Sequence, residues 1–175
     1  MIVGSVALLL VGIASSARAG SDADLVRDAE ATLAQFKRTD PGIEHFVSRA
    51  AGYVVFPSVG KGGLGIGGAH GAGVLFARGG KPIGKVTINQ VTIGAQAGGQ
   101  SYSEIIFLET PKQVADVESG KFSLAAQASA VALKTGASTN AKFENGVAIF
   151  TATKGGLMYE ASVGGQKMGF EPLKK

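Results

Sequence analysis

Between residues 21 and 38, apolar side chains recur at every third or fourth position, which predicts an amphipathic helix with one buried face. Asp22 and Asp24 stand near the start of this segment, and Lys37 and Arg38 stand at its end. The helix dipole favours acidic and basic side chains at these two ends respectively. The apolar stripe consists of Leu25, Val26, Ala29, Leu33 and Phe36.

Two shorter helices are predicted from their terminal residues. Asp40-Pro41 has the pattern of a cap followed by a first helical residue, so a short helix is predicted that starts at Pro41. Its apolar residues are Ile43, Phe46, Val47 and Ala50. A further helix is predicted over residues 111–119, because Thr110 is a good cap and Gly120 is a typical stop.

After residue 52 the hydrophobic pattern becomes that of β-strands. Residues 53–56 are β-branched or aromatic, and Pro57 is predicted to end this strand. From residue 60 to residue 73, glycine occupies nearly every second position. A helix there would cost about 1 kcal/mol per glycine relative to alanine, so extended structure with bulges is predicted. The remaining strand-like runs are residues 86–88, 91–93 and 105–108, with a turn at Gly79-Gly80 before them.

Two C-terminal segments complete the predicted sheet. In residues 122–133 the alanines favour a helix, whereas the alternation of apolar positions favours a strand. The strand is the preferred prediction, and the helix stays an alternative. Residues 146–153 and 157–163 are predicted to form a β-hairpin around Gly155-Gly156.

The fold class predicted from these elements is α+β. The chain has 27 glycines among 175 residues, which is roughly twice the usual proportion. Glycines alternating along strands allow either a ligand to approach the backbone or a sheet to curve tightly, and we favour tight curvature. We therefore expect a strongly curved, barrel-like, mainly antiparallel, glycine-rich sheet packed by N-terminal helices and one further helix.

The first residues are predicted to lie outside this fold. Residues 1–17 carry no charge and form an apolar run, which is followed by Ala17-Arg18-Ala19. This run is shorter than the roughly 20 residues of a membrane-spanning helix, and it closes with a small-x-small cleavage pattern. We predict a signal peptide over residues 1–19 and a single domain over residues 20–175.

Candidates for catalysis or cofactor binding are few. There is no cysteine, and His45 and His70 are the two histidines, so thiolate chemistry and multi-histidine metal sites are excluded. Residues 60–65 match G-x-G-x-x-G, but a dinucleotide site also needs a following helix and an acidic residue about 20 positions on. Neither is present in the sequence. We expect no enzymatic activity, no cofactor and no metal.

Charge is distributed unevenly along the chain, whose net charge is +4. Residues 20–75 contain 5 basic and 6 acidic residues, whereas residues 76–175 contain 11 and 7. The basic residues are dispersed and are not interleaved with aromatic ones, which argues against nucleic-acid binding. They form either a solvated surface or a surface for anionic headgroups. On the second interpretation, the candidate lipid-binding residues are Lys61, Lys81, Lys121, Lys154 and Lys167.

Three long segments resemble the SYLF domain, a family of lipid-binding domains. Residues 51–63 (AGYVVFPSVGKGG) resemble its opening signature, residues 94–104 (GAQAGGQSYSE) its central segment, and residues 154–166 (KGGLMYEASVGGQ) its closing segment. The resemblance extends over about residues 22–173. A predicted signal peptide followed by a single domain is similar to the bacterial branch of the family.

The resemblance implies non-catalytic binding of membrane lipid, with phosphoinositides as ligands of eukaryotic members and actin association in some. Eukaryotic members meet the membrane through an N-terminal amphipathic helix. Here the helix predicted over residues 21–38 is acidic along its first half, which anionic lipid would repel. We expect a lipid-binding protein of the bacterial periplasm or envelope, with an anionic lipid or membrane surface as partner. The alternative is a structural or self-associating envelope protein without a specific lipid.

Overall fold

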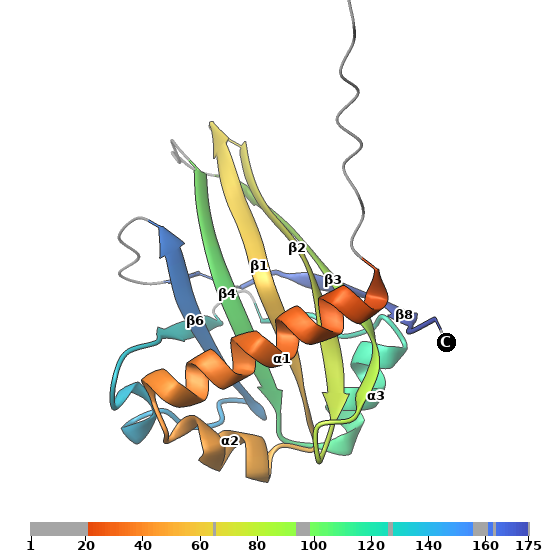
Figure 1. Cartoon of the computed structure of the whole chain (residues 1–175). Helices are drawn as coiled ribbons and strands as arrows, with labels where there is room; N and C mark the ends of the chain where they lie inside the picture. The colour runs from red at the N-terminus through yellow and green to blue at the C-terminus, as the bar shows by residue number, and fades with distance from the viewer. Residues whose placement is uncertain are drawn as a thin grey trace, which may run out of the picture.

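The structure is a computed structural model of the chain, and it describes residues 21–64, 66–93, 99–125, 128–155, 161–162 and 164–174. Figure 1 shows how helices and strands are arranged within these residues. The helices are α1 (Asp22–Thr39), α2 (Ile43–Arg49), α3 (Pro111–Glu118) and the short 3-10 helix η1 (Ala137–Thr139). The strands are β1 (Gly52–Leu64), β2 (Ile66–Ala77), β3 (Pro82–Ile93), β4 (Gly99–Leu108), β5 (Ser129–Ala132), β6 (Val147–Gly155), β7 (Ala161–Ser162) and β8 (Lys167–Pro172).

The described strands form one sheet in the order β7-β5-β6-β4-β1-β2-β3-β8. Neighbouring strands are antiparallel, except that β5 and β6 are parallel. The strands β1, β2 and β3 follow one another as hairpins, and β4 returns to pair with the free side of β1. The α+β fold class and the mainly antiparallel sheet are therefore confirmed.

Both faces of the sheet are buried, each under its own hydrophobic cluster. Along β1, Tyr53 and Val55 belong to one cluster, and Val54 and Phe56 belong to the other. Successive side chains of a strand point to opposite faces. Burial on both faces explains why β1 and β4 contain continuous apolar runs without polar alternation.

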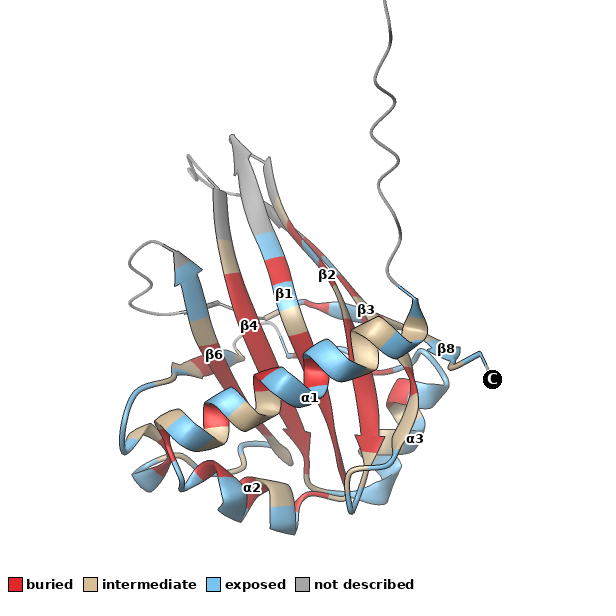
Figure 2. Ribbon diagram, in the orientation of Figure 1, coloured by how far each residue is buried: buried red, intermediate tan, exposed pale blue. Residues whose placement is uncertain are grey.

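The cluster under α1 and α2 is called the helix-side core below. Figure 1 shows α1 lying across β6, β4, β1 and β2, and Figure 2 shows the buried stretches of these strands. The helix-side core comprises Ala29, Phe36, Ile43, Phe46, Ala50, Tyr53, Val55, Val74, Phe76, Ile105, Phe107, Ala148 and Phe150. Phe46 of α2 is central to it, with ring centroids 5.0 Å from Phe150 and 5.7 Å from Phe107.

The cluster on the opposite face is called the inner core. It comprises Val54, Phe56, Val59, Ala69, Leu75, Val86, Ile88, Tyr102, Ile106, Leu108, Val117, Phe122, Leu124, Ala130, Ile149 and Met168. The helix α3 contributes Val117, which is fully buried, and Val114 packs against the same cluster. Both valines therefore face the inner core.

The sheet is curled but not closed. Within the described residues its ends are β7 and β8, and these two strands do not pair. The chain after α3 bridges part of the gap: Leu124 N donates to Gln166 O at 3.1 Å, and Gly165 N donates to Leu124 O at 3.1 Å. Ser123 forms an isolated bridge with Lys167 at the start of β8. The expected strong curvature is present, and the barrel is incomplete.

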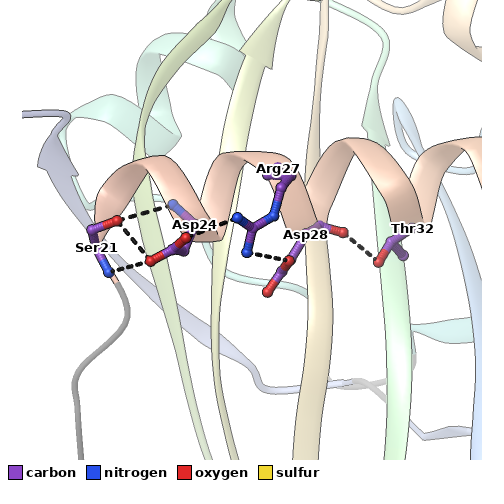
Figure 3. A network of polar contacts seen from close by, with 5 residues as sticks. All are labelled: Ser21, Asp24, Arg27, Asp28 and Thr32. Carbon is purple, nitrogen blue, oxygen red and sulfur yellow. Dashed lines mark hydrogen bonds and ion pairs between the residues drawn. The ribbon is translucent and has the colours of Figure 1, made fainter.

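The start of α1 is fixed by a capping box (Figure 3). Ser21 Oγ accepts a hydrogen bond from Asp24 N at 3.2 Å, and Asp24 Oδ2 accepts one from Ser21 N at 3.3 Å. Arg27 contacts both Asp24, at 3.0 Å, and Asp28, at 3.5 Å. One guanidinium is thus shared by two carboxylates, and the exposed face at the start of α1 stays acidic, as the sequence predicts.

Two predicted boundaries are wrong. The helix α2 begins at Ile43, with Gly42 as its N-cap, because the Asp40 carboxylate accepts a hydrogen bond from Gly42 N at 3.1 Å. The strand β1 does not end at Pro57 but continues to Leu64. Its pairing with both neighbouring strands shifts register across residues 55–59. A bulge accommodates a proline because the residue there needs no ladder hydrogen bond.

The C-terminal predictions are partly corrected. Residues 129–132 form the strand β5, which supports the strand interpretation for that part, while residues 126–127 lie outside the described residues. The predicted hairpin partner of β6 does not pair with it in the described chain: β7 pairs with β5, which lies between β7 and β6. The reason is that β4 and β5 already occupy the two edges of β6. Residues 156–160, including the turn residue Gly156, lie outside the described residues.

The predicted turn at Gly79-Gly80 is confirmed, with φ of 88° and 85° respectively.

Residues 1–20 lie outside the described residues, so the signal peptide over residues 1–19 stays a prediction. Among the helices that the structure describes, none is long and apolar enough to cross a bilayer.

Candidate functional site

A cavity of about 470 Å³ opens beside β6, between this strand, α3 and the segments before and after β5. Pockets that hold small molecules usually measure about 300–1,000 Å³. The cavity is lined by Gln113, Asp116, Lys121, Phe122, Ser123, Leu124, Ala125, Ala128, Ser129, Val131, Asn140, Ala141, Lys142, Glu144, Asn145, Val147, Ala148, Ile149 and Phe150.

The cavity exists because one edge of β6 lacks a full-length neighbour. In the described chain, β5 pairs with β6 only at Phe150 and Thr151. The first residues of β6, 147–149, therefore have no strand beside them on that side. Ile149 faces the inner core and Ala148 faces the helix-side core, and both line the cavity. The cavity thus reaches both hydrophobic layers at the edge of the sheet.

The deep wall of the cavity is apolar. Phe122, Leu124, Ile149 and Phe150 line it, although each is at most 8% exposed. Such a wall offers few hydrogen-bond partners to water, and genuinely apolar cavities are therefore poorly hydrated. The wall is suited to an apolar ligand group.

The mouth of the cavity is polar and carries charged side chains of both signs. Lys121 and Lys142 line the cavity and are both exposed, so their ammonium groups lie towards solvent. Two acidic residues also line it, Asp116 and Glu144. Asp116 is ion-paired with Lys112, which lies 2.6 Å away on the same helix. When Lys112 is counted, three lysines accompany the two carboxylates of Asp116 and Glu144, which leaves one positive charge in excess.

The loop between β5 and β6 covers one side of the cavity and is held at two places. At its end, Gln113 Nε2 donates to Asn145 O at 3.1 Å, and Glu109 N donates to Gly146 O at 2.9 Å. At its middle, Ser138 N donates to the Asp40 carboxylate at 2.7 Å. The loop is thereby tied both to α3 and to the α1–α2 connection.

Asp40 is the buried anchor of this loop, with only 3% exposure. Desolvation by itself would raise the pKa of its carboxyl group. Hydrogen bonds from Ser138 and Gly42 outweigh that effect and lower the pKa below its ordinary value. The carboxylate therefore stays ionised while it holds the loop in place.

A second polar cluster lies inside the curled sheet, away from the cavity lining. Gln166 Nε2 donates to Glu104 Oε2 at 3.3 Å, and both residues are fully buried. Gln90 Nε2 donates to Gly164 O at 2.8 Å. Burial, and then the negative charge of Glu104, raise the pKa of Tyr102 far above its ordinary value, so its hydroxyl stays neutral. These contacts connect the turn before β8 to β3 and β4.

The five lysines predicted to bind lipid do not all lie together. Lys81 follows the β2–β3 turn, Lys121 follows α3, Lys154 lies near the end of β6 and Lys167 begins β8; these four are exposed. Lys61 lies in β1, and its side chain is outside the description.

Lys154 and Lys167 lie at the same end of the sheet, and Lys81 lies at the other end. Gly155, which follows Lys154, is connected to Lys167 across the sheet by residues that pair with one another on successive strands. These residues are Ser101, Gly60, His70 and Asn89. Of the five lysines, Lys121 alone lines the cavity among the described residues.

Both histidines occupy surface positions. His70 is exposed and its Nδ1 lies 3.0 Å from Asn89 Oδ1. His45 is exposed and packs edge-on against Phe46. No group of three or more His, Cys, Asp or Glu in the described part of the chain could hold a metal ion. The glycine motif at residues 60–65 falls on β1 as far as residue 64.

Sequence reasoning missed Lys142 and the cavity itself. The alternation of Phe122, Leu124 and Ala130 was visible as a strand-like pattern, and it does separate buried from exposed side chains here. Lys142 has no such local signal, because it reaches the cavity only through the anchored loop.

Comparison with known proteins supports the family resemblance for the C-terminal half of the chain. Residues 89–171 match the family model Ysc84, described as Las17-binding protein actin regulator, the family of the SYLF domain. A search of curated proteins found no match. The matched segment contains the last five residues of β3, all of β4 to β7, and nearly all of β8, and includes every residue that lines the cavity.

Proposed function

Since residues 89–171 match the SYLF family, we propose that this protein binds lipid without catalysis at an anionic membrane surface. The observation that carries this proposal is the cavity beside β6, which combines an apolar wall with Lys121 and Lys142 at its mouth. An apolar pocket with a few polar groups at its opening is the usual form of a small-molecule site. The mouth would face the membrane.

Charge supports the choice of an anionic surface. The chain has a net charge of +4, and the excess of basic residues lies in residues 76–175, which include the cavity. The exposed start of α1 is acidic, with Asp24 and Asp28 sharing Arg27 (Figure 3). The membrane would therefore meet the cavity side rather than α1. The predicted headgroup contacts Lys61, Lys81, Lys154 and Lys167 would add long-range attraction.

We place this activity in the bacterial periplasm or envelope, because the apolar run and small-x-small pattern of residues 1–19 predict export. An exported protein would not meet actin, so the proposal takes from the family only its association with lipid. N-terminal sequencing of the mature protein should begin at Gly20. Recovery of protein that begins at Met1 from the envelope would contradict the export.

The test is co-sedimentation with vesicles of neutral phosphatidylcholine, or of phosphatidylcholine mixed with anionic phosphatidylglycerol. We expect preference for the anionic vesicles and weaker binding as salt rises. Each lysine near an anionic surface contributes about 1 kcal/mol. Neutralising Lys121 and Lys142 to Gln should therefore weaken binding by about 30-fold. The matched control is Lys37→Gln with Arg38→Gln on α1, which removes the same charge from two residues outside the cavity lining, and should have little effect.

Three results would count against the proposal. Equal weakening by both double variants would show that net charge, and not the cavity mouth, attracts the membrane. Equal binding to both vesicle types at all salt concentrations would contradict the anionic surface. Absence of binding to either, together with a size-exclusion profile that shifts with concentration, would favour the self-associating envelope protein.

A further inference from the structure

We infer that the cavity beside β6 binds one acyl chain of a single-chain acidic amphiphile, such as a free fatty acid, with the acid group at Lys121 and Lys142. This inference rests on the proposed function and names the ligand class of the same site. A protein with such a site would hold an individual lipid away from the bilayer, which surface attraction alone does not accomplish.

The walls select an apolar chain. Side chains from both hydrophobic layers meet in the cavity: Phe122, Leu124 and Ile149 from the inner core, and Ala148 and Phe150 from the helix-side core. Apolar surface that remains in contact with water is stabilised when an apolar group displaces the water. The cavity follows the part of β6 that lacks a neighbouring strand, so its length runs along a strand edge.

The volume selects one chain. A space of about 470 Å³ equals roughly 15 water molecules at about 30 Å³ each. A methylene group is nearly as large as a water molecule, so one chain of about 12–16 carbons is the size that fits. A phospholipid with two such chains is too large to enter completely.

The charges at the mouth of the cavity favour a ligand with an acidic head group. Lys112 Nζ lies 2.6 Å from the Asp116 carboxylate and balances its charge. The other charged residues of the lining are Lys121, Lys142 and Glu144, which together carry one net positive charge. A ligand that brings one carboxylate would balance the remaining positive charge. The side-chain amide of Asn140, which also lines the cavity, can donate a further hydrogen bond.

The experiment measures binding of palmitate in the absence of vesicles, by displacement of a naphthalene-sulfonate dye and by native mass spectrometry. We expect one palmitate per chain. Ala128→Phe places a ring on the cavity wall and should weaken palmitate binding at least about tenfold. The matched control is Ala132→Phe, on the exposed side of the same segment and outside the lining. Melting temperatures verify folding, and Ala141→Phe serves as a second cavity-filling variant from the opposite wall.

A second comparison tests the head. Hexadecanol has the same chain as palmitate but no charge, and Lys121→Gln with Lys142→Gln should weaken binding of palmitate more than that of hexadecanol. The inference is overturned if palmitate does not bind, or if it binds both cavity-filling variants as tightly as the wild type. Equal affinity for hexadecanol and palmitate would overturn the acidic head. Vesicle binding without palmitate binding would refute this inference alone, and leave the proposed function standing.

Discussion

Replacing Asp40 by alanine should loosen the loop that covers the cavity. The carboxylate accepts hydrogen bonds from Ser138 N at 2.7 Å and from Gly42 N at 3.1 Å, and it is 3% exposed. Ser138 is buried as well, at 9% exposure. In Asp40→Ala the Ser138 amide would lose its charged acceptor in a place that water does not easily reach.

The magnitude follows mainly from this one bond. A hydrogen bond to a charged group contributes about 1.5–3 kcal/mol, and a buried donor left without an acceptor costs a similar amount. Gly42 is exposed, so water can replace the carboxylate there. We expect a loss of about 2 kcal/mol in the free energy of unfolding, which corresponds to about 4–8 °C in melting temperature for a domain of this size. Asp40→Asn retains one acceptor oxygen and should lose about half as much.

The pH dependence identifies the mechanism. Hydrogen bonds lower the pKa of Asp40 in the folded state, whereas the unfolded chain has the ordinary value of about 3.9. A lowered pKa means that the stabilisation is fully present above the unfolded value and is lost as pH falls through the folded one. The difference in melting temperature between wild type and Asp40→Ala should therefore be constant at neutral pH and shrink below about pH 4.

Thermal unfolding of both proteins, followed by circular dichroism over this pH range, measures the difference. Because other titrating groups are common to the two proteins, their effects cancel. Equal melting temperatures at pH 7 would refute the anchoring role of Asp40. A difference that persists unchanged into strong acid would refute the charged hydrogen bond as its cause.

Two further substitutions test the packing that positions the cavity. Phe46→Ala should cost about 3–5 kcal/mol in denaturant unfolding, because Phe46 is 2% exposed and packs against the rings of Phe107, Phe143 and Phe150; a cost below 1 kcal/mol would show that α2 is not part of the core. Gly84→Val should destabilise the edge strand β8, since an added Cβ would overlap the Phe170 ring and lie 2.8 Å from Glu171 O. Overpacking of this kind costs typically about 1–3 kcal/mol, and wild-type stability would refute the β3–β8 pairing.

The helices and their caps could be predicted from the sequence because their signals are local. Ser21 and Thr110 each form a capping box with the residue three positions on, and both helices begin within one residue of the predicted place. The prolines were less informative. Pro41 precedes its helix rather than starting it, and Pro57 lies inside a strand, because a hydrogen-bonded carboxylate and a bulge accommodate them.

The sheet order and the cavity could not be predicted, because both depend on contacts between distant segments. The parallel pairing of β5 with β6 is the clearest case: it places Val131 opposite Phe150, and it leaves the beginning of β6 without a strand on the side away from β4. Local hydrophobic patterns identify strands but do not say which strands pair. The position of Lys142 likewise depends on the loop between β5 and β6. Asp40 holds this loop through Ser138, which lies 98 residues later in the chain.

The surroundings of Gly71 and Gly73 explain why the proposed ligand site does not lie over these glycines. An added Cβ at Gly71 would lie 2.8 Å from Ser58 O and 3.1 Å from a methyl group of Val59, and one at Gly73 would overlap the Phe56 ring. These glycines are covered by large side chains of the neighbouring strand, so the space that they leave is already filled. They allow the sheet to curl around the inner core, as the favoured interpretation of the sequence holds. In the part of the chain that the structure describes, the cavity lies where the curled sheet lacks a strand, beside β6, and its mouth carries Lys121 and Lys142.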